Sequence, residues 1–180
     1  MNSERADVAL IRCDDYESKK LDRAIETCAE IAGFPDIKDK IILIKPNVLN
    51  ASPASKAVTT NPAFVEAVIR FVKSRGAKEI LVGDSPGWQP VLLAAKTSGI
   101  YDAVQQSGGT WVDFREVSPH PVVDGKKLKN IPLTALLEKV DLVINLPKLK
   151  NHSLTTYTGA IKNLFGLIPG TAKSAMHLQY

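Results

Sequence analysis

The sequence predicts an α/β fold, built as a mostly parallel open sheet of about five strands flanked by helices, with a small β-hairpin excursion near residues 115–132. Two observations predict this class. Apolar runs that suit strands alternate with amphipathic helical patterns along the chain. Several of those runs are apolar throughout, as in parallel strands that are covered on both faces. With 180 residues, 44% of them apolar, the chain is expected to form one α/β domain over residues 1–180.

The first half of the chain is expected to supply three strands and two helices. Asn61 suits the N-cap of the second helix, Pro62 suits its first position and Gly76 suits its stop. The expected elements, in order, are a strand at 7–13, a helix at 17–32, a strand at 40–45, a helix from Pro62 and a strand at 79–84.

The second half is expected to continue the alternation and to add the hairpin. A break near Ser98 and Gly99 predicts two short helices within 91–109, and Asp124-Gly125 predicts the hairpin turn. The remaining expected elements are a strand at 110–117, a helix at 134–140, a strand at 141–147 and a short helix at 158–164.

Polar residues collect where three of these strands end. Because parallel strands meet at one carboxyl edge, where open α/β sheets bind ligands, the three loops are expected to converge there. Each residue alone has an ordinary structural explanation, such as a solvated lysine or a turn cap, so the agreement of three loops is what indicates a site. The residues concerned are Lys45, Asn47, Asp84, Ser85, Asn145, Lys148, Lys150 and His152, with Lys162 and Asn163 in the short helix that follows.

The residue types predict an anion-binding site. The lysines Lys45, Lys148, Lys150 and Lys162 would hold phosphate or carboxylate groups as point charges. The polar side chains that would orient such a ligand are Asn47, Ser85, Asn145 and Asn163. Asp84 and His152 are candidates for acid–base catalysis.

The distribution of charge supports this prediction. The net charge is +4, and residues 142–180 contain four lysines but no aspartate or glutamate. A second stretch without acidic residues runs over 40–65. Segregation of this kind produces a field that attracts an anion. The same region could instead bind an acidic partner protein, but 142–180 lacks arginine and has few aromatic residues, so nucleic-acid binding is not expected.

The stretch Gly83-Asp84-Ser85-Pro86-Gly87 matches the G-x-S-x-G pattern of a hydrolase nucleophile elbow. The residue after the nucleophile in that motif donates its backbone N–H to the oxyanion hole. Here that residue is Pro86, which has no N–H. A hydrolase that uses Ser85 is therefore a lesser alternative, and Ser85 is expected to be a turn residue that faces the crevice.

The cysteines and the hydropathy of the sequence limit which compartment and which cofactors are expected. Cys13 and Cys28 form no C-x-x-C motif, which favours a reducing compartment over a disulfide framework or a metal site. One aspartate and one histidine on separate loops make an incomplete metal-ligand set, so no metal site is predicted. No secretory leader or membrane-spanning run is recognisable, and a cytoplasmic protein without membrane contact is expected.

Several segments resemble the domain-of-unknown-function family 362 (DUF362), namely "IILIKPNVL", "TTNPAFVEAVIRFVKSRGAKEILVGDSPG", "DLVINLPKLKNHSLTTYTGAIKNLFGLIPG" and the final Lys173 and His177. A 4Fe–4S ferredoxin-like module accompanies many members of this family. This chain lacks the cysteines for it, so the resemblance implies the domain alone or a truncated member, with any cluster outside residues 1–180. Two functions follow as expectations: a domain that binds an anionic substrate or cofactor in an iron–sulfur-linked redox enzyme, or a non-catalytic docking module for a ferredoxin-like or other electron-transfer partner.

Overall fold

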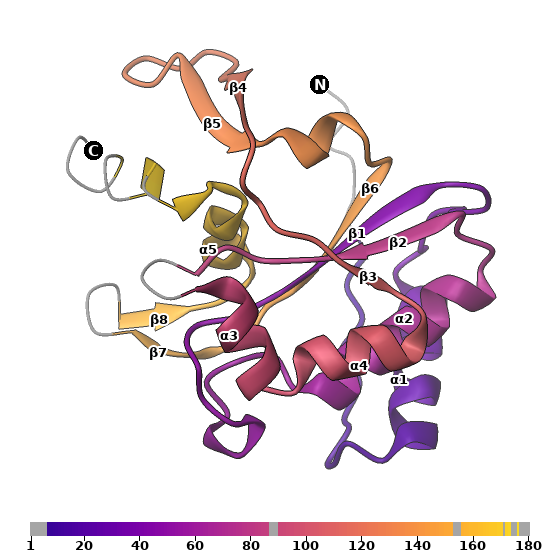
Figure 1. Ribbon diagram of the computed structural model, residues 1–180. Helices are drawn as coiled ribbons and strands as arrows, with labels where there is room; N and C mark the ends of the chain where they lie inside the picture. The colour runs from indigo at the N-terminus through magenta and orange to yellow at the C-terminus, as the bar shows by residue number, and fades with distance from the viewer. Residues whose placement is uncertain (1–6, 87–89, 153–155, 171, 174–175, 177–180) are drawn as a thin grey trace.

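A computed structural model describes residues 7–86, 90–152, 156–170, 172–173 and 176 (Figure 1). Its centre is a four-stranded sheet in the order β3-β2-β1-β6, in which every neighbouring pair is parallel. The α/β class is therefore confirmed, with four strands in the main sheet. Their bounds are β1 Ile41–Pro46, β2 Glu79–Val82, β3 Thr110–Trp111 and β6 Leu142–Leu146.

One face of the sheet is covered by helices (Figure 1). Apolar side chains from all four helices and from β1, β2 and β6 form the larger core. The central strand β1 is almost wholly buried, which explains its uninterrupted apolar sequence. The helices are α1 Ser18–Ile31, α2 Pro62–Ser74, α3 Val91–Thr97 and α4 Ile100–Ser107.

Local sequence signals set the ends of α2 as predicted. The Asn61 side chain accepts a hydrogen bond from the backbone N–H of Ala63, and Pro62 occupies the first turn. Beyond the helix, Gly76 has φ +79°, a conformation that glycine adopts without strain. The two short helices α3 and α4 are likewise divided at Gly99, as predicted.

The opposite face carries a smaller core and irregular cover. Leu43 and Leu81 pack there against Phe114 and Leu167, with partly buried residues of β5 and η2 around them. The β4–β5 hairpin projects from the body of the molecule (Figure 1), and its predicted turn residue Asp124 has φ +56°. The elements concerned are β4 Val117–Pro121, β5 Asn130–Thr134, η2 Ala135–Glu138 and η3 Phe165–Leu167.

Three predicted elements differ from the structure. Residues 7–13 form no strand, and Val8 and Leu10 are exposed, because both edges of β1 are already paired with β2 and β6. The strand expected at 110–117 is only two residues long, since its later residues leave the sheet to cover the second core. The helix expected at 134–140 is a 3-10 turn over Ala135–Glu138.

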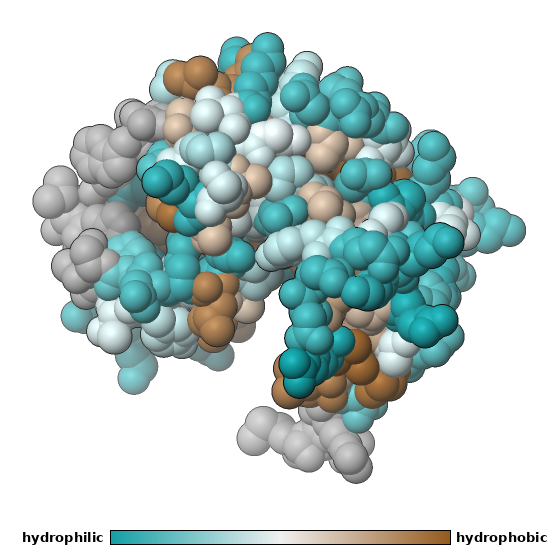
Figure 2. All heavy atoms as spheres, turned by 90° about the horizontal axis from the view of Figure 1, so that it is seen from below, coloured by the Kyte–Doolittle hydropathy of each residue, from teal (hydrophilic) through white to brown (hydrophobic). Residues whose placement is uncertain are grey.

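The carboxyl edge of the sheet holds the remaining elements. The hairpin β7–β8 was not predicted, whereas the short helix α5 was; both lie beyond the end of β6 (Figure 1). Their bounds are η1 Ala54–Lys56, β7 Lys150–His152, β8 Thr156–Thr158 and α5 Ala160–Leu164. Seen from below, the surface is mostly hydrophilic and deeply indented (Figure 2).

All four strands are parallel, but the order in which the chain places them reverses at β1. From β1 the chain proceeds outward to β2 and β3, and it then returns to place β6 on the other side of β1. The adjacent strands β1 and β6 are therefore followed by loops that lead away from each other. A crevice outside the carboxyl ends of such strands is the usual ligand site of open α/β sheets.

Candidate functional site

A buried ion pair forms the floor of the site at this crevice. The Nζ of Lys45, at the end of β1, lies 2.6 Å from Oδ1 of Asp84, which follows β2. The side chain of Lys45 is 0% exposed and that of Asp84 is 4% exposed. A buried charge is costly unless it is paired and hydrogen-bonded, so these two residues depend on each other.

Both carboxylate oxygens of Asp84 are fully used. The backbone N–H of Ser85 donates to Oδ1 at 2.8 Å, and that of Val48 donates to Oδ2 at 2.7 Å. Asp84 thus ties the loop after β1 to the turn after β2. The carboxylate faces Lys45 and these backbone donors, so its geometry supports an electrostatic role in the floor more than proton transfer.

Asn163 of α5 joins the ends of β1 and β6. Its Oδ1 accepts hydrogen bonds from Lys45 Nζ at 3.3 Å and from Asn47 Nδ2 at 3.1 Å. Its Nδ2 donates to Oδ1 of Asn145 at 2.8 Å, and Asn145 in turn donates to the carbonyl of Ala160 at 2.8 Å. One buried amide therefore connects all three of the predicted asparagines.

Lys150 of β7 joins the same hydrogen-bond network through Asn47. Its Nζ donates to Oδ1 of Asn47 at 2.6 Å and to the carbonyl oxygen of Val58. The two ends of the loop between β1 and α2 are joined, because the backbone N–H of Asn47 donates to Thr60 Oγ1 at 2.8 Å. Thr60 Oγ1 in turn donates to the carbonyl of Leu146, which attaches this loop to the end of β6. The side chain of Lys150 is therefore held at a fixed place above the floor.

The turn after β2 is held by the C-terminal segment. The backbone N–H of Gly170 donates to Ser85 Oγ at 3.0 Å, and Lys173 Nζ donates to the carbonyl oxygen of Ser85. Ser85 lies in an irregular segment after β2, and its hydroxyl accepts a bond from the backbone; its role as a turn residue stays a prediction. Gly87 of the G-x-S-x-G motif and His177 lie outside the described residues.

The lysines around Asp84 perturb one another. Burial lowers the pKa of Lys150 to about 8; Asp84 opposes this shift, while Lys148 and Lys162 add to it. Burial also lowers the pKa of Lys173 to about 8, with Asp84 opposing and Lys45 adding to the shift. The pKa of Lys162 is lowered by burial as well. Asp84 thus interacts with Lys45, Lys150 and Lys173, while Lys148 and Lys162 act on Lys150, and this excess of positive charge is one that an anion would relieve.

Gly166 in η3 permits the floor to be covered. A Cβ built at this position would lie 2.5 Å from Lys45 Nζ, 2.6 Å from Lys45 Cε, and against Asp84 Oδ1. Any other residue would displace the buried pair, whose atoms are fixed by their hydrogen bonds. Gly166 and Lys173 were not among the predicted site residues; the sequence signals for Lys173 were the stretch without acidic residues and the resemblance to DUF362.

The structure brings most of the predicted residues together. Hydrogen bonds link the residues Lys45, Asn47, Asp84, Asn145, Lys150 and Asn163, and Ser85 adjoins them through Asp84. Lys148 and Lys162 lie close enough to Lys150 to influence its pKa. His152 is on β7 two residues after Lys150, so both side chains leave the strand on the same face. The assignment of Asp84 and His152 to catalysis stays a prediction.

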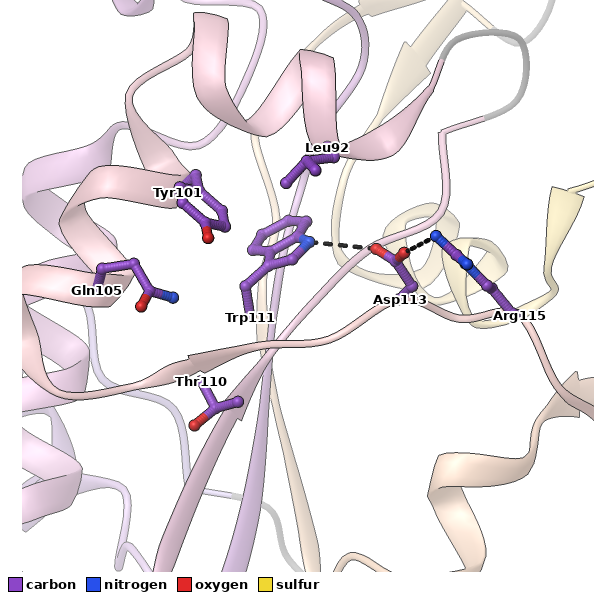
Figure 3. Close-up of a pocket in the computed structure, with 7 residues that line it drawn as sticks. All are labelled: Leu92, Tyr101, Gln105, Thr110, Trp111, Asp113 and Arg115. Atoms are coloured by element: carbon purple, nitrogen blue, oxygen red, sulfur yellow. Dashed lines mark hydrogen bonds and ion pairs between the residues drawn. The ribbon is translucent and has the colours of Figure 1, made fainter.

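Two cavities with shared lining residues lie on the side of β3, and the smaller one adjoins this site. A cavity of about 270 Å³ is lined by Asp84 and Ser85 at one end and by Leu92, Asp113 and Arg115 at the other. Those last three residues also line a larger cavity of about 510 Å³, which extends past Trp111 (Figure 3).

The residues of this chain do not fit an iron–sulfur cluster. A 4Fe–4S cluster takes four cysteine ligands, whereas the whole sequence has two, Cys13 and Cys28. Cys13 is exposed and Cys28 is partly buried in α1. In the described part of the chain, no group of three or more His, Cys, Asp or Glu residues is placed to hold a metal ion.

Comparison with known proteins gives a family and a relative. The family described as "Domain of unknown function (DUF362)" matches residues 42–180. The "Thylakoid-associated protein sll1697" of Synechocystis sp. is 32% identical over 176 residues, which are 96% of this chain and 54% of that protein. This chain thus spans about half the length of that relative. No solved structure matches this chain.

Hydropathy within the structure adds one observation. Among the described residues, no helix is long and apolar enough to cross a lipid bilayer.

Proposed function

This chain belongs to the DUF362 family. We propose that it binds a phosphate- or carboxylate-bearing substrate or cofactor at the carboxyl edge of its sheet. In this proposal the chain is part of an iron–sulfur-linked redox enzyme whose cluster lies outside residues 1–180. The observation that carries the proposal is the grouping of Lys45, Lys150 and Lys173 around the buried carboxylate of Asp84, with Lys148 and Lys162 near Lys150, where the strand order of the sheet reverses.

The lysines divide into two kinds. Lys45 is fully buried and already paired with Asp84, so it holds the floor in place and contributes its field from beneath. Lys148, Lys150, Lys162 and Lys173 are only partly buried, and they can contact a ligand. The lowered pKa values of Lys150 and Lys173 fit this role, because an anion would supply the negative charge that their surroundings lack.

Thermal unfolding in the presence of pyrophosphate tests the proposal. A ligand at a hundred times its Kd stabilises the folded state by about 2.7 kcal/mol, so the midpoint should rise with pyrophosphate, and less at high ionic strength. The double variant Lys148→Gln/Lys162→Gln should bind pyrophosphate about tenfold more weakly. The matched control Lys126→Gln/Lys127→Gln removes the same charge from the β4–β5 hairpin.

The control separates a site from a general field. If the hairpin variant loses as much affinity as the site variant, net charge alone attracts the anion and the proposal fails. If pyrophosphate, inorganic phosphate and small carboxylates all leave the midpoint of the folded protein unchanged, the proposal fails as well.

A second candidate function, a docking module for an electron-transfer protein, is favoured by an exposed apolar surface beside the same lysines. Leu149 is 76% exposed, Tyr157 64% and Ile161 88%. Leu149 and Tyr157 are neighbours, since a Cβ on Gly159 would contact both. An apolar centre with a basic rim suits an acidic partner such as a ferredoxin-like module.

The lesser alternative, a hydrolase, gains no support from the geometry. Ser85 Oγ accepts a bond from Gly170, and Pro86 offers no N–H for an oxyanion. The cytoplasmic location also stays a prediction, and the name of the relative associates that protein with the thylakoid.

A further inference from the structure

A cleft of about 510 Å³ follows the end of β3, next to α3 and α4 (Figure 3). This volume falls within the range of roughly 300–1,000 Å³ that is typical of small-molecule sites. One wall is apolar and aromatic, and neutral polar side chains stand at the other end. The lining residues are Leu92, Tyr101, Gln105, Thr110, Trp111, Asp113 and Arg115.

The aromatic wall is held in a fixed orientation. The indole N–H of Trp111 donates to Oδ1 of Asp113 at 3.3 Å, and Oδ2 of Asp113 pairs with Arg115 at 2.6 Å. Tyr101 meets Trp111 edge to face, with ring centroids 6.4 Å apart, and Lys96 lies 5.2 Å above the Tyr101 ring. A rigid indole next to a cleft is a surface on which a planar ring can stack.

The cleft is next to a cavity that borders the lysine site. It shares Leu92, Asp113 and Arg115 with the smaller cavity, which ends at Asp84 and Ser85. Lys173 contacts the carbonyl of Ser85, so positive charge stands at this inner end. A ligand that enters past Trp111 would therefore meet the lysines with its far end.

The strand register gives the scale of the separation. Ile44, Val82 and Trp111 lie in one row across β1, β2 and β3. Neighbouring strands are about 4.8 Å apart, so the backbones of Ile44 and Trp111 are about 10 Å apart.

We propose that the cleft is the ring-binding subsite of the same ligand, and that the ligand is a mononucleotide-class molecule, a planar heteroaromatic ring joined to a phosphate. The ring stacks against Trp111 and Leu92, Gln105 bonds its polar edge, and the phosphate reaches the lysines. This assignment rests on the proposed anion site and adds the class of substrate or cofactor to it.

Calorimetric titration of the whole chain tests the assignment with four probes: inorganic phosphate, ribose 5-phosphate, AMP and FMN. At least one mononucleotide should bind about fivefold or more tightly than ribose 5-phosphate, because stacking on an aromatic side chain contributes about that much. Trp111→Leu should abolish the difference and leave the affinity for ribose 5-phosphate unchanged.

A second pair of variants keeps the test decisive if Trp111→Leu does not fold. Leu92 lines the cleft and is 40% exposed, whereas Leu93, its neighbour on α3, is 53% exposed and does not line it. Leu92→Ala should weaken mononucleotide binding, and Leu93→Ala should not.

The outcomes are distinguishable from those of the anion site itself. Equal affinity for ribose 5-phosphate and both mononucleotides overturns the subsite but leaves the proposed function standing, as does a loss of affinity that is the same in Leu92→Ala and Leu93→Ala. Absence of binding by all four probes overturns both.

Discussion

At the scale of single residues, the site depends on charges that are partly or wholly withdrawn from water. Lys45 and Asp84 neutralise each other in the floor, while Lys150 and Lys173 donate hydrogen bonds to uncharged oxygens and burial lowers their pKa values to about 8. In the unfolded chain these lysines would titrate near 10.5. Their protonation is therefore disfavoured by folding and is expected to be favoured by an anion.

Two opposite pH trends follow from these shifts. Between about pH 8 and 10.5 the unfolded chain holds protons that the folded chain has released, so the free energy of unfolding of the ligand-free protein should rise with pH. The affinity for inorganic phosphate, which stays a dianion in this window, should fall by about tenfold per pH unit for each lysine that must be protonated. Denaturant unfolding and calorimetry at several pH values measure both. A phosphate affinity that stays constant up to pH 10 would contradict the assignment of Lys150 and Lys173.

At the scale of elements, α5 is attached to the sheet mainly through one polar residue. Asn163 is buried and bonds the ends of β1 and β6, whereas Ile161 is 88% exposed and Leu164 41%. The short helix thus buries an amide where most helices bury an apolar stripe. Its position over the site is specified by hydrogen bonds.

Replacement of Asn163 should therefore release α5. Asn163→Ala removes the hydrogen bonds that its buried side chain makes with Lys45, Asn47 and Asn145, and we expect the free energy of unfolding to fall by about 2–4 kcal/mol. Amide exchange in Ala160–Leu164 should become faster. Ile161→Ala, on the exposed side of the same helix, should change the stability by no more than about 0.5 kcal/mol. Equal effects of the two variants would show that packing holds the helix.

The elements that the sequence predicted are those with local signals. Asn61, Pro62 and Gly99 mark helix ends by their own chemistry, and those ends were confirmed. A strand, by contrast, requires a partner, and nothing within 7–13 reveals that both edges of β1 are already occupied. The β7–β8 hairpin has strands of three residues, too short for a recognisable alternation of apolar and polar side chains.

The site was predicted in its location and incompletely in its geometry. Parallel topology alone brings the ends of β1, β2 and β6 together, so the convergence of Lys45, Asp84 and Asn145 followed from the order of the strands. The burial of Lys45 could not be foreseen, because it results from α5 and η3 folding over the end of β1. A lysine at the end of a strand has the same sequence whether it is covered or solvated.

At the scale of the whole molecule, apolar and basic surface occur together at the carboxyl edge. Lys148 and Lys162 lie beside the exposed side chains of Leu149, Tyr157 and Ile161. Residues 142–180 carry no acidic side chain that would offset their charge. This edge is therefore the part of the molecule best suited to an acidic partner.

A binding measurement with a bacterial 4Fe–4S ferredoxin tests the docking candidate. Ile161→Glu places a negative charge at an exposed position next to Lys162 and should lower the affinity for an acidic partner about fivefold or more, since like charges that meet at an interface repel each other. Leu93→Glu makes the same change on the exposed surface of α3 and should have little effect. Ferredoxin binding that is insensitive to Ile161→Glu would exclude this surface as the docking site.

The lone hydrogen atom that Gly166 carries in place of a side chain has a consequence for how a ligand is received. It lets the backbone of η3 rest directly against the Lys45–Asp84 pair, leaving no space there for solvent. The dipoles and charges beneath the ligand are consequently oriented before it arrives, and little reorganisation remains to be done on binding. The site would then select among anions because its floor is rigid: an anion whose shape does not match the floor would bind poorly.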